Sequence, residues 1–208
     1  MTSNEEINVT KRNGRGFESL NIDKIHSMVG FATEGITGVS ASHVEMNSGL
    51  QFFDKISTED IQQILIKSAN DLISLDSPNY QYVAARLLLF SLRKKLFHRL
   101  WEHPKFIDHI KSLVDMGLYD KGILENYTES EIDRMGMWVD HERDYSFTYA
   151  GLRQVMDKYL VQDRSNGEIF ETPQFMYMMI AATLFAKYPK EKRLTYVKKY
   201  YEAVSKFK

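Results

Sequence analysis

The feature that most constrains the fold of this chain is a long apolar segment near its middle. Ser77 and Pro78 have the pattern of a helix start, in which a capping residue precedes a proline at the first helical position. The helix predicted from there runs through Tyr82 to Phe97, and its first half is apolar on nearly every side. A helix that is apolar all round is buried among other elements. We therefore predict that this segment is the central helix of a mainly α-helical domain.

Segments before this helix supply its expected neighbours. Apolar residues recur at helical spacing from Ile22 to Ala32, and Gly35 provides a stop. Ser40 to Phe53 is a weaker helix candidate. A capping pattern at Ser57 opens a further amphipathic helix that reaches Ile73. Together with the central helix, these segments make four predicted helices.

Pro104 interrupts the helical pattern, and a second region follows. Its predicted elements are a helix at Phe106 to Met116, a helix capped by Thr128 and Glu131, a helix at Tyr145 to Tyr159, a hairpin around Asn166-Gly167, a helix opened by Thr172-Pro173, and a last helix from about Glu191 to Phe207. We expect two domains, at residues 1–102 and 103–208, and a short β-hairpin within the second.

Charged residues near the start of the chain suggest a nucleotide site. Val9 to Gly14 is predicted to be a strand and turn, and Phe17 to Asn21 the returning strand of a β-hairpin. Basic and polar residues of the hairpin and the predicted helices could bind a triphosphate and the edge of a base. They are Lys11, Arg12, Glu18, Asn21, Lys24 and Lys94. For any single lysine, a solvated surface is the simpler interpretation. The run Arg93-Lys94-Lys95 is likewise expected either beside the hairpin or in solvent near a helix end.

Several classes of site are disfavoured. The chain has no cysteine, which excludes disulfides, thiolate metal sites and thiol nucleophiles within it. It contains no P-loop or dinucleotide-binding glycine motif, and its six histidines form no zinc-ligand pair. The dense cluster Asp140 to Asp144 is interpreted as a salt-linked surface or subunit contact rather than a metal or acid–base site. Phe175 to Met179 is interpreted as packing or an interface rather than a cofactor pocket.

Composition sets the remaining bounds. The net charge of −1 gives no reason to expect a general attraction to nucleic acid or to a membrane. No apolar run approaches the roughly 20 residues of a membrane span, and Met1 to Glu6 is polar, unlike a secretory signal. A cytoplasmic location is the default expectation.

Three segments in order, Val9 to Gly14, Leu20 to Ile25 and Pro78 to Leu87, resemble the ATP-cone of ribonucleotide reductases. Later stretches, at Asp140 to Tyr149, Lys158 to Gln162 and Lys192 to Lys208, look like the part of the class I large subunit that follows the cone. The resemblance implies a β-hairpin cap on a four-helix bundle. It also implies that ATP, with magnesium, favours activity there and that dATP inhibits by changing how the subunits assemble.

The resemblance also assigns roles to residues. Phosphates would be held by Lys11, Arg12, Lys24 and Lys94, with a hydroxyl from Thr58. Glu18 and Asn21 would select adenine, and Val9 and Phe90 would line the pocket. Gln62 stands where related sequences often carry a histidine, and the hairpin between Arg12 and Glu18 is one residue longer than usual. Both departures bear on whether dATP is still distinguished from ATP.

The resemblance implies an oxidoreductase that makes deoxyribonucleotides for DNA replication. Its catalytic barrel, with the essential cysteines, would follow Lys208, so we expect this chain to be an N-terminal piece, from a split gene or otherwise shortened, with no catalytic residue and no redox cofactor. Activity would then require a complementary large-subunit chain carrying the barrel and a radical-generating small subunit, with the large subunit as a dimer.

Two other functions stay open from the sequence. The first is a structural docking fragment of a split reductase with a degenerate, non-sensing cone. The second is a nucleotide-responsive transcription repressor, which is disfavoured because such proteins pair the cone with a cysteine zinc ribbon.

Overall fold

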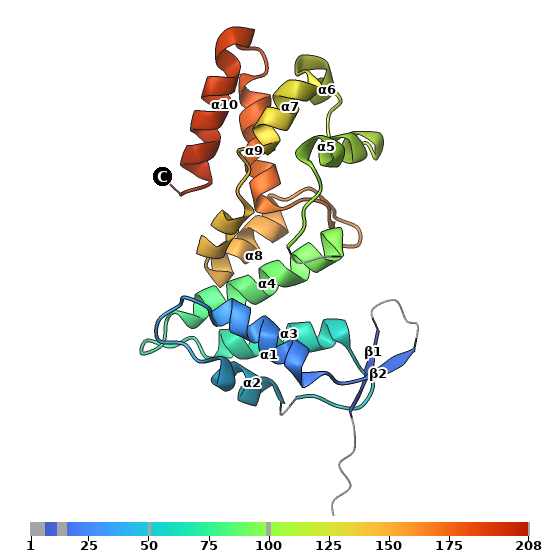
Figure 1. The fold of residues 1–208 in the computed structure, drawn as a ribbon, viewed down its shortest axis with the longest axis vertical. Coiled ribbons are helices and arrows are strands. Elements are labelled where there is room, and N and C mark those ends of the chain that lie inside the picture. The colour runs from blue at the N-terminus through green and yellow to red at the C-terminus, as the bar shows by residue number, and fades with distance from the viewer. Residues whose placement is uncertain (1–6, 12–15, 50, 99–100, 208) are drawn as a thin grey trace, which may run out of the picture. The chain divides into compact units, whose positions relative to one another are not determined.

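The computed structural model describes residues 7–11, 16–49, 51–98 and 101–207. The chain divides into two compact units (Figure 1): the described residues of 1–91 together with 145–152, and 92–144 together with 153–208. The two compact units therefore do not follow the domain boundary predicted between residues 102 and 103, and that boundary stays a prediction.

The first unit begins with a small sheet. Strands β1 (Asn8–Thr10) and β2 (Phe17–Ser19) are antiparallel, and β3 (Ile56–Ser57) pairs with β1 in parallel, in the order β2-β1-β3. The hairpin predicted from the sequence is confirmed, whereas the third strand was not predicted. The turn of the hairpin, at residues 12–15, lies outside the described residues.

The helices that accompany this sheet are α1 (Ile22–Thr33), α2 (Ala41–Gly49), α3 (Thr58–Asp71) and the first part of α4 (Tyr80–Phe97), which continues into the second unit. Helix α2 is shorter than the predicted segment, and α4 begins two residues after Pro78. Gly35 follows α1 with a φ of 70°, a left-handed conformation that glycine adopts at little cost.

The first part of α4 lies at the centre of its unit, as its uniform apolarity predicts. Val83, Leu87 and Leu89 are fully buried, and Phe90 is 1% exposed. The apolar faces of the neighbouring helices contribute further buried side chains, such as Val29 and Leu65. Burial of these large side chains supplies most of the driving force for packing.

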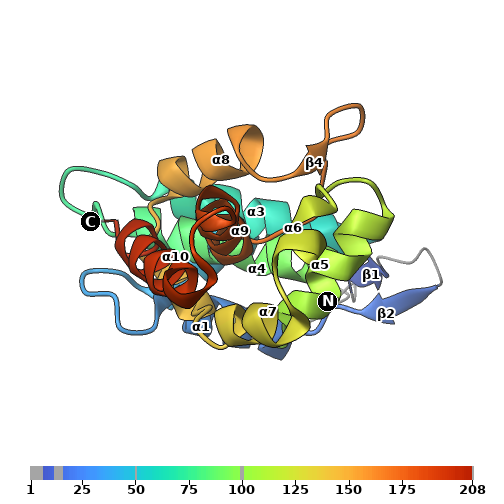
Figure 2. The same ribbon diagram turned by 90° about the horizontal axis from the view of Figure 1, so that it is seen from above.

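The second unit is also mainly helical. Its elements include α5 (Phe106–Asp115), α6 (Gly122–Asn126), α7 (Glu129–Gly136), strands β4 (Gln162–Asp163) and β5 (Glu168–Ile169), α9 (Pro173–Phe185) and α10 (Lys190–Val204). Helices α9 and α10 lie side by side (Figure 2). The predicted capping box at Thr128 and the hairpin around Asn166-Gly167 are both present. The fold class, mainly α with an N-terminal hairpin cap and a later short hairpin, is confirmed.

One predicted helix is shorter than expected. The predicted segment from Tyr145 to Tyr159 begins with the last residues of a 3-10 helix, η1 (His141–Ser146), and the α-helix within it is α8 (Tyr149–Lys158). The side chain of Thr148 accepts a hydrogen bond from the backbone N–H of Gly151 at 3.2 Å, which places the helix start after residue 148.

The Arg93-Lys94-Lys95 run is expected beside the hairpin or in solvent, and the Asp140–Asp144 cluster at a salt-linked surface or subunit contact. Solvation is wrong for Arg93, and a surface position is wrong for Asp144. Arg93 is 2% exposed and Asp144 is 1% exposed, and their Nη2 and Oδ2 atoms lie 3.5 Å apart. Gln174 donates a hydrogen bond to Asp144 Oδ1 at 2.8 Å. Arg143 does form the expected salt links, to Asp140 and to Glu202. The two buried charges are tolerated because each has a partner.

Candidate nucleotide site

Three of the predicted site residues come together on the hairpin and the first helix. Lys11 follows β1, Glu18 lies on β2, and Lys24 lies in the first turns of α1. The Glu18 carboxylate is 3.4 Å from Lys11 Nζ and 3.8 Å from Lys24 Nζ. Two ammonium groups therefore converge on one acidic side chain at the surface, as a site for a polyanion requires.

The sheet also positions the first turn of α3. Thr10 is the register partner of Ser57, so Lys11 and Thr58 follow neighbouring residues at the same end of the sheet. The Ser57 hydroxyl accepts a hydrogen bond from the backbone N–H of Asp60 at 2.9 Å, which caps α3. Thr58 lies in the first turn of that helix, where backbone N–H groups without helical partners favour anions.

Asn21 has a structural role at the start of α1. Its side-chain oxygen accepts a hydrogen bond from the backbone N–H of Lys24 at 3.0 Å. This bond fixes the direction in which α1 leaves the hairpin, and so it helps to place Lys24 near Glu18. Asn21 is exposed, and its predicted contact with adenine stays a prediction.

Val9, Gln62 and Phe90 are buried within the first unit. Val9 is 3% exposed between its register partners on β2 and β3. Gln62 is 2% exposed and donates a hydrogen bond to the carbonyl of Leu87 at 2.9 Å. The Phe90 ring meets the edge of Tyr145, with the ring centres 6.3 Å apart. These contacts hold the unit together, and the roles of the three residues at a nucleotide stay predictions.

Two predicted phosphate ligands cannot be placed beside the hairpin. Arg12 lies outside the described residues. Lys94 is half-buried in the last turn of α4, in the second compact unit. Their predicted contacts with phosphate stay predictions.

Sequence reasoning missed two charged residues next to the hairpin. Asp54 accepts hydrogen bonds from the backbone and side chain of Asn8, at 2.9 and 3.1 Å, and the Asn8 bonds hold the pKa of that carboxyl below its usual value. Lys55 has a φ of 66°, and its ammonium lies 5.9 Å from the centre of the Phe17 ring. Lys55 therefore adds a third cation to this part of the sheet. Its only signal in the sequence is its place just before β3.

Other kinds of site find less support. Within the described ranges, no three or more histidine or acidic side chains are grouped so that they could hold a metal ion. No helix in the described part of the chain is long and apolar enough to cross a membrane.

Comparison with known proteins identifies two domains in the chain. Residues 7–95 match the ATP cone domain, and residues 145–208 match the all-alpha domain of ribonucleotide reductase. Over 205 residues, the chain is 51% identical to ribonucleoside-diphosphate reductase 1 subunit alpha of Escherichia coli (strain K12). This chain therefore contains the ATP cone and the all-alpha domain of a ribonucleotide reductase.

Other ribonucleoside-diphosphate reductase alpha subunits match over a similar length. The identity is 50% over 205 residues with the alpha subunit of Salmonella typhimurium and 43% over 199 residues with that of Enterobacteria phage T4. The alignment with the Escherichia coli protein covers 99% of this chain and 27% of that relative, so the chain spans about a quarter of the length of such subunits. All ten predicted nucleotide-site residues lie within the ATP cone match.

Proposed function

We propose that the ATP cone of this reductase chain binds ATP and dATP and thereby regulates the overall activity of a ribonucleoside-diphosphate reductase. The observation that carries the proposal is the convergence of Lys11 and Lys24 on Glu18 at the hairpin. A triphosphate offers several anionic oxygens, and charge-assisted hydrogen bonds to them are stronger than the exposed contacts with one carboxylate.

In this proposal, phosphate oxygens replace Glu18 as the partner of the two lysines. The released Glu18 carboxylate then accepts a hydrogen bond from the exocyclic amine of adenine. Thr58 contributes its hydroxyl and the N-terminal turn of α3 to the phosphates. Magnesium, which is commonly held by phosphates together with one or two carboxylates, enters with the nucleotide.

The wider enzyme is part of the same proposal. These 208 residues contain no cysteine, so thiol chemistry would come from outside them, from large-subunit residues that form the catalytic barrel. A small subunit would generate the radical. ATP or dATP at the cone would change how the large subunits, as dimers, and the small subunits assemble, and the product would be deoxyribonucleotides for DNA replication.

Isothermal titration calorimetry of the chain with ATP and with dATP, in the presence of magnesium, tests the binding step. Lys11→Ala and Lys24→Ala should each weaken binding, because each removes a charge-assisted contact with phosphate. Lys158→Ala, an exposed lysine on α8, is the matched control. No heat of binding for either nucleotide at millimolar concentration would refute the proposal.

The alternative of a docking fragment with a non-sensing cone is favoured by one observation. The amide of Gln62 is buried and donates a hydrogen bond to the carbonyl of Leu87, so part of this side chain is committed to holding the unit together. Reductase activity of the complete enzyme that does not respond to dATP would support the alternative, and inhibition by dATP would exclude it.

A further inference from the structure

A cavity of about 430 Å³ lies in the second unit, apart from every residue assigned to the nucleotide. Its volume falls in the usual range for pockets that bind small molecules. Apolar walls come from Pro104, Phe106, Val139 and Phe175. Phe106 lies close to Gly136 on α7, where an added Cβ would be only 3.0 Å from the Phe106 Cβ. The close approach of α5 and α7 thus forms one wall.

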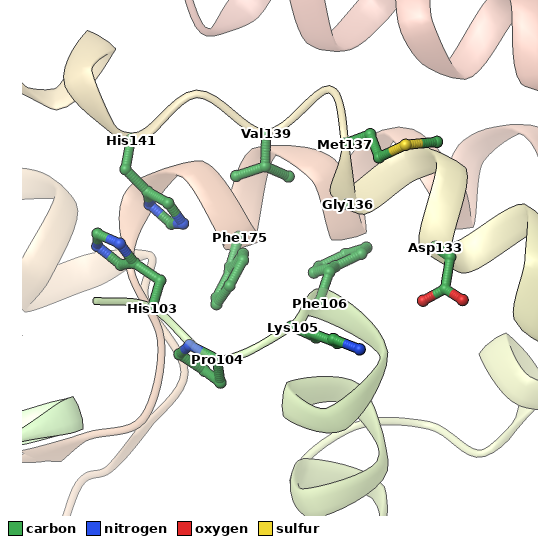
Figure 3. Close-up of a pocket in the computed structure, with 10 residues that line it drawn as sticks. All are labelled: His103, Pro104, Lys105, Phe106, Asp133, Gly136, Met137, Val139, His141 and Phe175. Atoms are coloured by element: carbon green, nitrogen blue, oxygen red, sulfur yellow. The ribbon is translucent and has the colours of Figure 1, made fainter. Parts of the chain in front are cut away.

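Two histidines form the opposite end of this cavity. Their rings are stacked, with the centres 3.7 Å apart and the planes within 6°, and Phe175 meets the edge of His141 (Figure 3). Burial, together with the Arg93 charge, lowers the pKa of His103 to about 4, and burial, together with His103 and Arg93, lowers that of His141 to about 2. Both imidazoles are therefore neutral near pH 7. They suit an apolar ligand and still offer nitrogen atoms for hydrogen bonds.

His141 has a nitrogen to offer. Its Nδ1 lies 3.5 Å from the Thr172 hydroxyl, whereas its Nε2 has no hydrogen-bond partner among the described residues. A neutral imidazole nitrogen is either a donor or an acceptor, depending on the tautomer. A ligand hydroxyl can donate and accept, so it fits either tautomer.

The other end of the cavity carries one charge of each sign. The ammonium of Lys105 and the carboxylate of Asp133 lie on the side away from the two histidines (Figure 3). Both residues are exposed, and the charge of Asp133 also acts on Lys111 of α5. A ligand with both an anionic and a cationic group on one atom would satisfy both.

We propose that this cavity binds a free aromatic amino acid whose ring carries a hydroxyl group. Its carboxylate contacts Lys105, its ammonium contacts Asp133, its ring lies among Phe106, Phe175 and Val139, and its hydroxyl bonds to His141. A terminus of a peptide would supply only one of the two charges, so the free amino acid is the better match.

The test is a two-dimensional NMR titration of the 208-residue chain with L-tyrosine. Three analogues each lack one group: L-phenylalanine lacks the hydroxyl, tyramine lacks the carboxylate, and N-acetyl-L-tyrosine lacks the ammonium. L-tyrosine should shift the resonances of residues 103–106 and 136–141, and each analogue should bind about tenfold more weakly, the effect of one lost hydrogen bond to a charged or buried group.

Two variants test which residue contacts the carboxylate of the ligand and which contacts its ammonium group. Lys105→Met should weaken L-tyrosine about tenfold without changing tyramine, which has no carboxylate to lose. Asp133→Asn should weaken L-tyrosine and tyramine but leave N-acetyl-L-tyrosine unchanged. Lys158→Met and Asp108→Asn, both exposed and outside the cavity, are the controls.

Several results would overturn the proposal. They are no shift with L-tyrosine at its solubility limit, equal binding of L-phenylalanine, or variants indistinguishable from their controls. A titration with ATP that shifts the same resonances more strongly would assign the cavity to a nucleotide instead.

Discussion

Replacing Glu18 separates the two roles proposed for its carboxylate, which are to pair with the lysines and to recognise adenine. Glu18 holds Lys11 and Lys24 at 3.4 and 3.8 Å, with lysine side chains that are 46% and 71% exposed. Exposed ion pairs of this kind contribute roughly 0.2–1 kcal/mol each. At this exposure we take about 1 kcal/mol for the two together, which corresponds to about a fivefold change in affinity. This is the penalty that a phosphate ligand overcomes when it displaces Glu18.

Two substitutions distinguish competition from base recognition. Glu18→Ala removes the competing charge, so inorganic tripolyphosphate should bind about fivefold more tightly. The same change removes the acceptor for adenine, and a hydrogen bond to a charged group is worth about 1.5–3 kcal/mol, so the preference for ATP over tripolyphosphate should fall about tenfold or more. Glu18→Gln also removes the charge but keeps a carbonyl acceptor for a neutral hydrogen bond, so it should lose roughly half as much of that preference, in free energy, as Glu18→Ala.

The assay is calorimetry with ATP, GTP and tripolyphosphate on the wild-type chain and both variants at one ionic strength, because exposed charge pairs are screened by salt. Tripolyphosphate that binds no more tightly to Glu18→Ala than to wild type would show that Glu18 does not compete with phosphate. An unchanged ratio of ATP to tripolyphosphate affinity would show that Glu18 does not recognise adenine.

Three further predictions concern buried polar groups. Gln62→Ala should lower the free energy of unfolding by about 2 kcal/mol in urea denaturation, because the Leu87 carbonyl loses its donor; an unchanged value would refute this role. Burial raises the pKa of Asp144 to about 7, above its unfolded value of 3.8. The stabilising contribution of this group is therefore lost as pH rises. When the pH is lowered from 7 to 5, the free energy of unfolding of wild type should increase by about 2 kcal/mol relative to that of Asp144→Asn; parallel pH profiles of the two proteins would contradict this. Burial lowers the pKa of His109 from 6.5 to about 4. The contribution of His109 to the free energy of unfolding is present in full above pH 6.5 and should fall by about 3 kcal/mol as the pH is lowered to 4. His109→Phe should remove this part of the acid dependence of Tm.

Local patterns in the sequence are enough to predict most of the helices. Periodic apolar residues and side-chain caps act within a few residues, which is why the starts of α3, α7 and α9 agree with the predictions. The strand β3 was missed because it is two residues long and forms only by pairing with β1. The two strands are far apart in the sequence: Asn8 of β1 bonds to Asp54, just before β3, across 46 residues. A pairing of that kind has no local signal.

The same distinction applies to the nucleotide site. Lys11, Glu18 and Lys24 are close in sequence, and a hairpin followed by a helix brings them together. Lys55 reaches the same sheet only through β3, so the prediction did not include it. The cavity is lined by residues that are scattered between His103 and Phe175, so no short sequence motif predicts it.

The buried pair of Arg93 and Asp144 shows how charge can mislead a prediction from sequence. Each residue stands in a run of charged neighbours, which normally indicates solvent. In the structure, Arg93 also donates to the His141 carbonyl at 2.6 Å, and Asp144 accepts from Gln174. Removing two charges from water costs about as much as their attraction returns, so such a pair adds little net stability, while packings that leave either charge alone are strongly penalised. The pair therefore favours the packing that brings its two segments together over packings that separate them. If Asp144→Asn were more stable than wild type at pH 7 and still adopted a single fold, the charge pair would not be needed to specify the packing. Burying Asp144 would then only destabilise the protein.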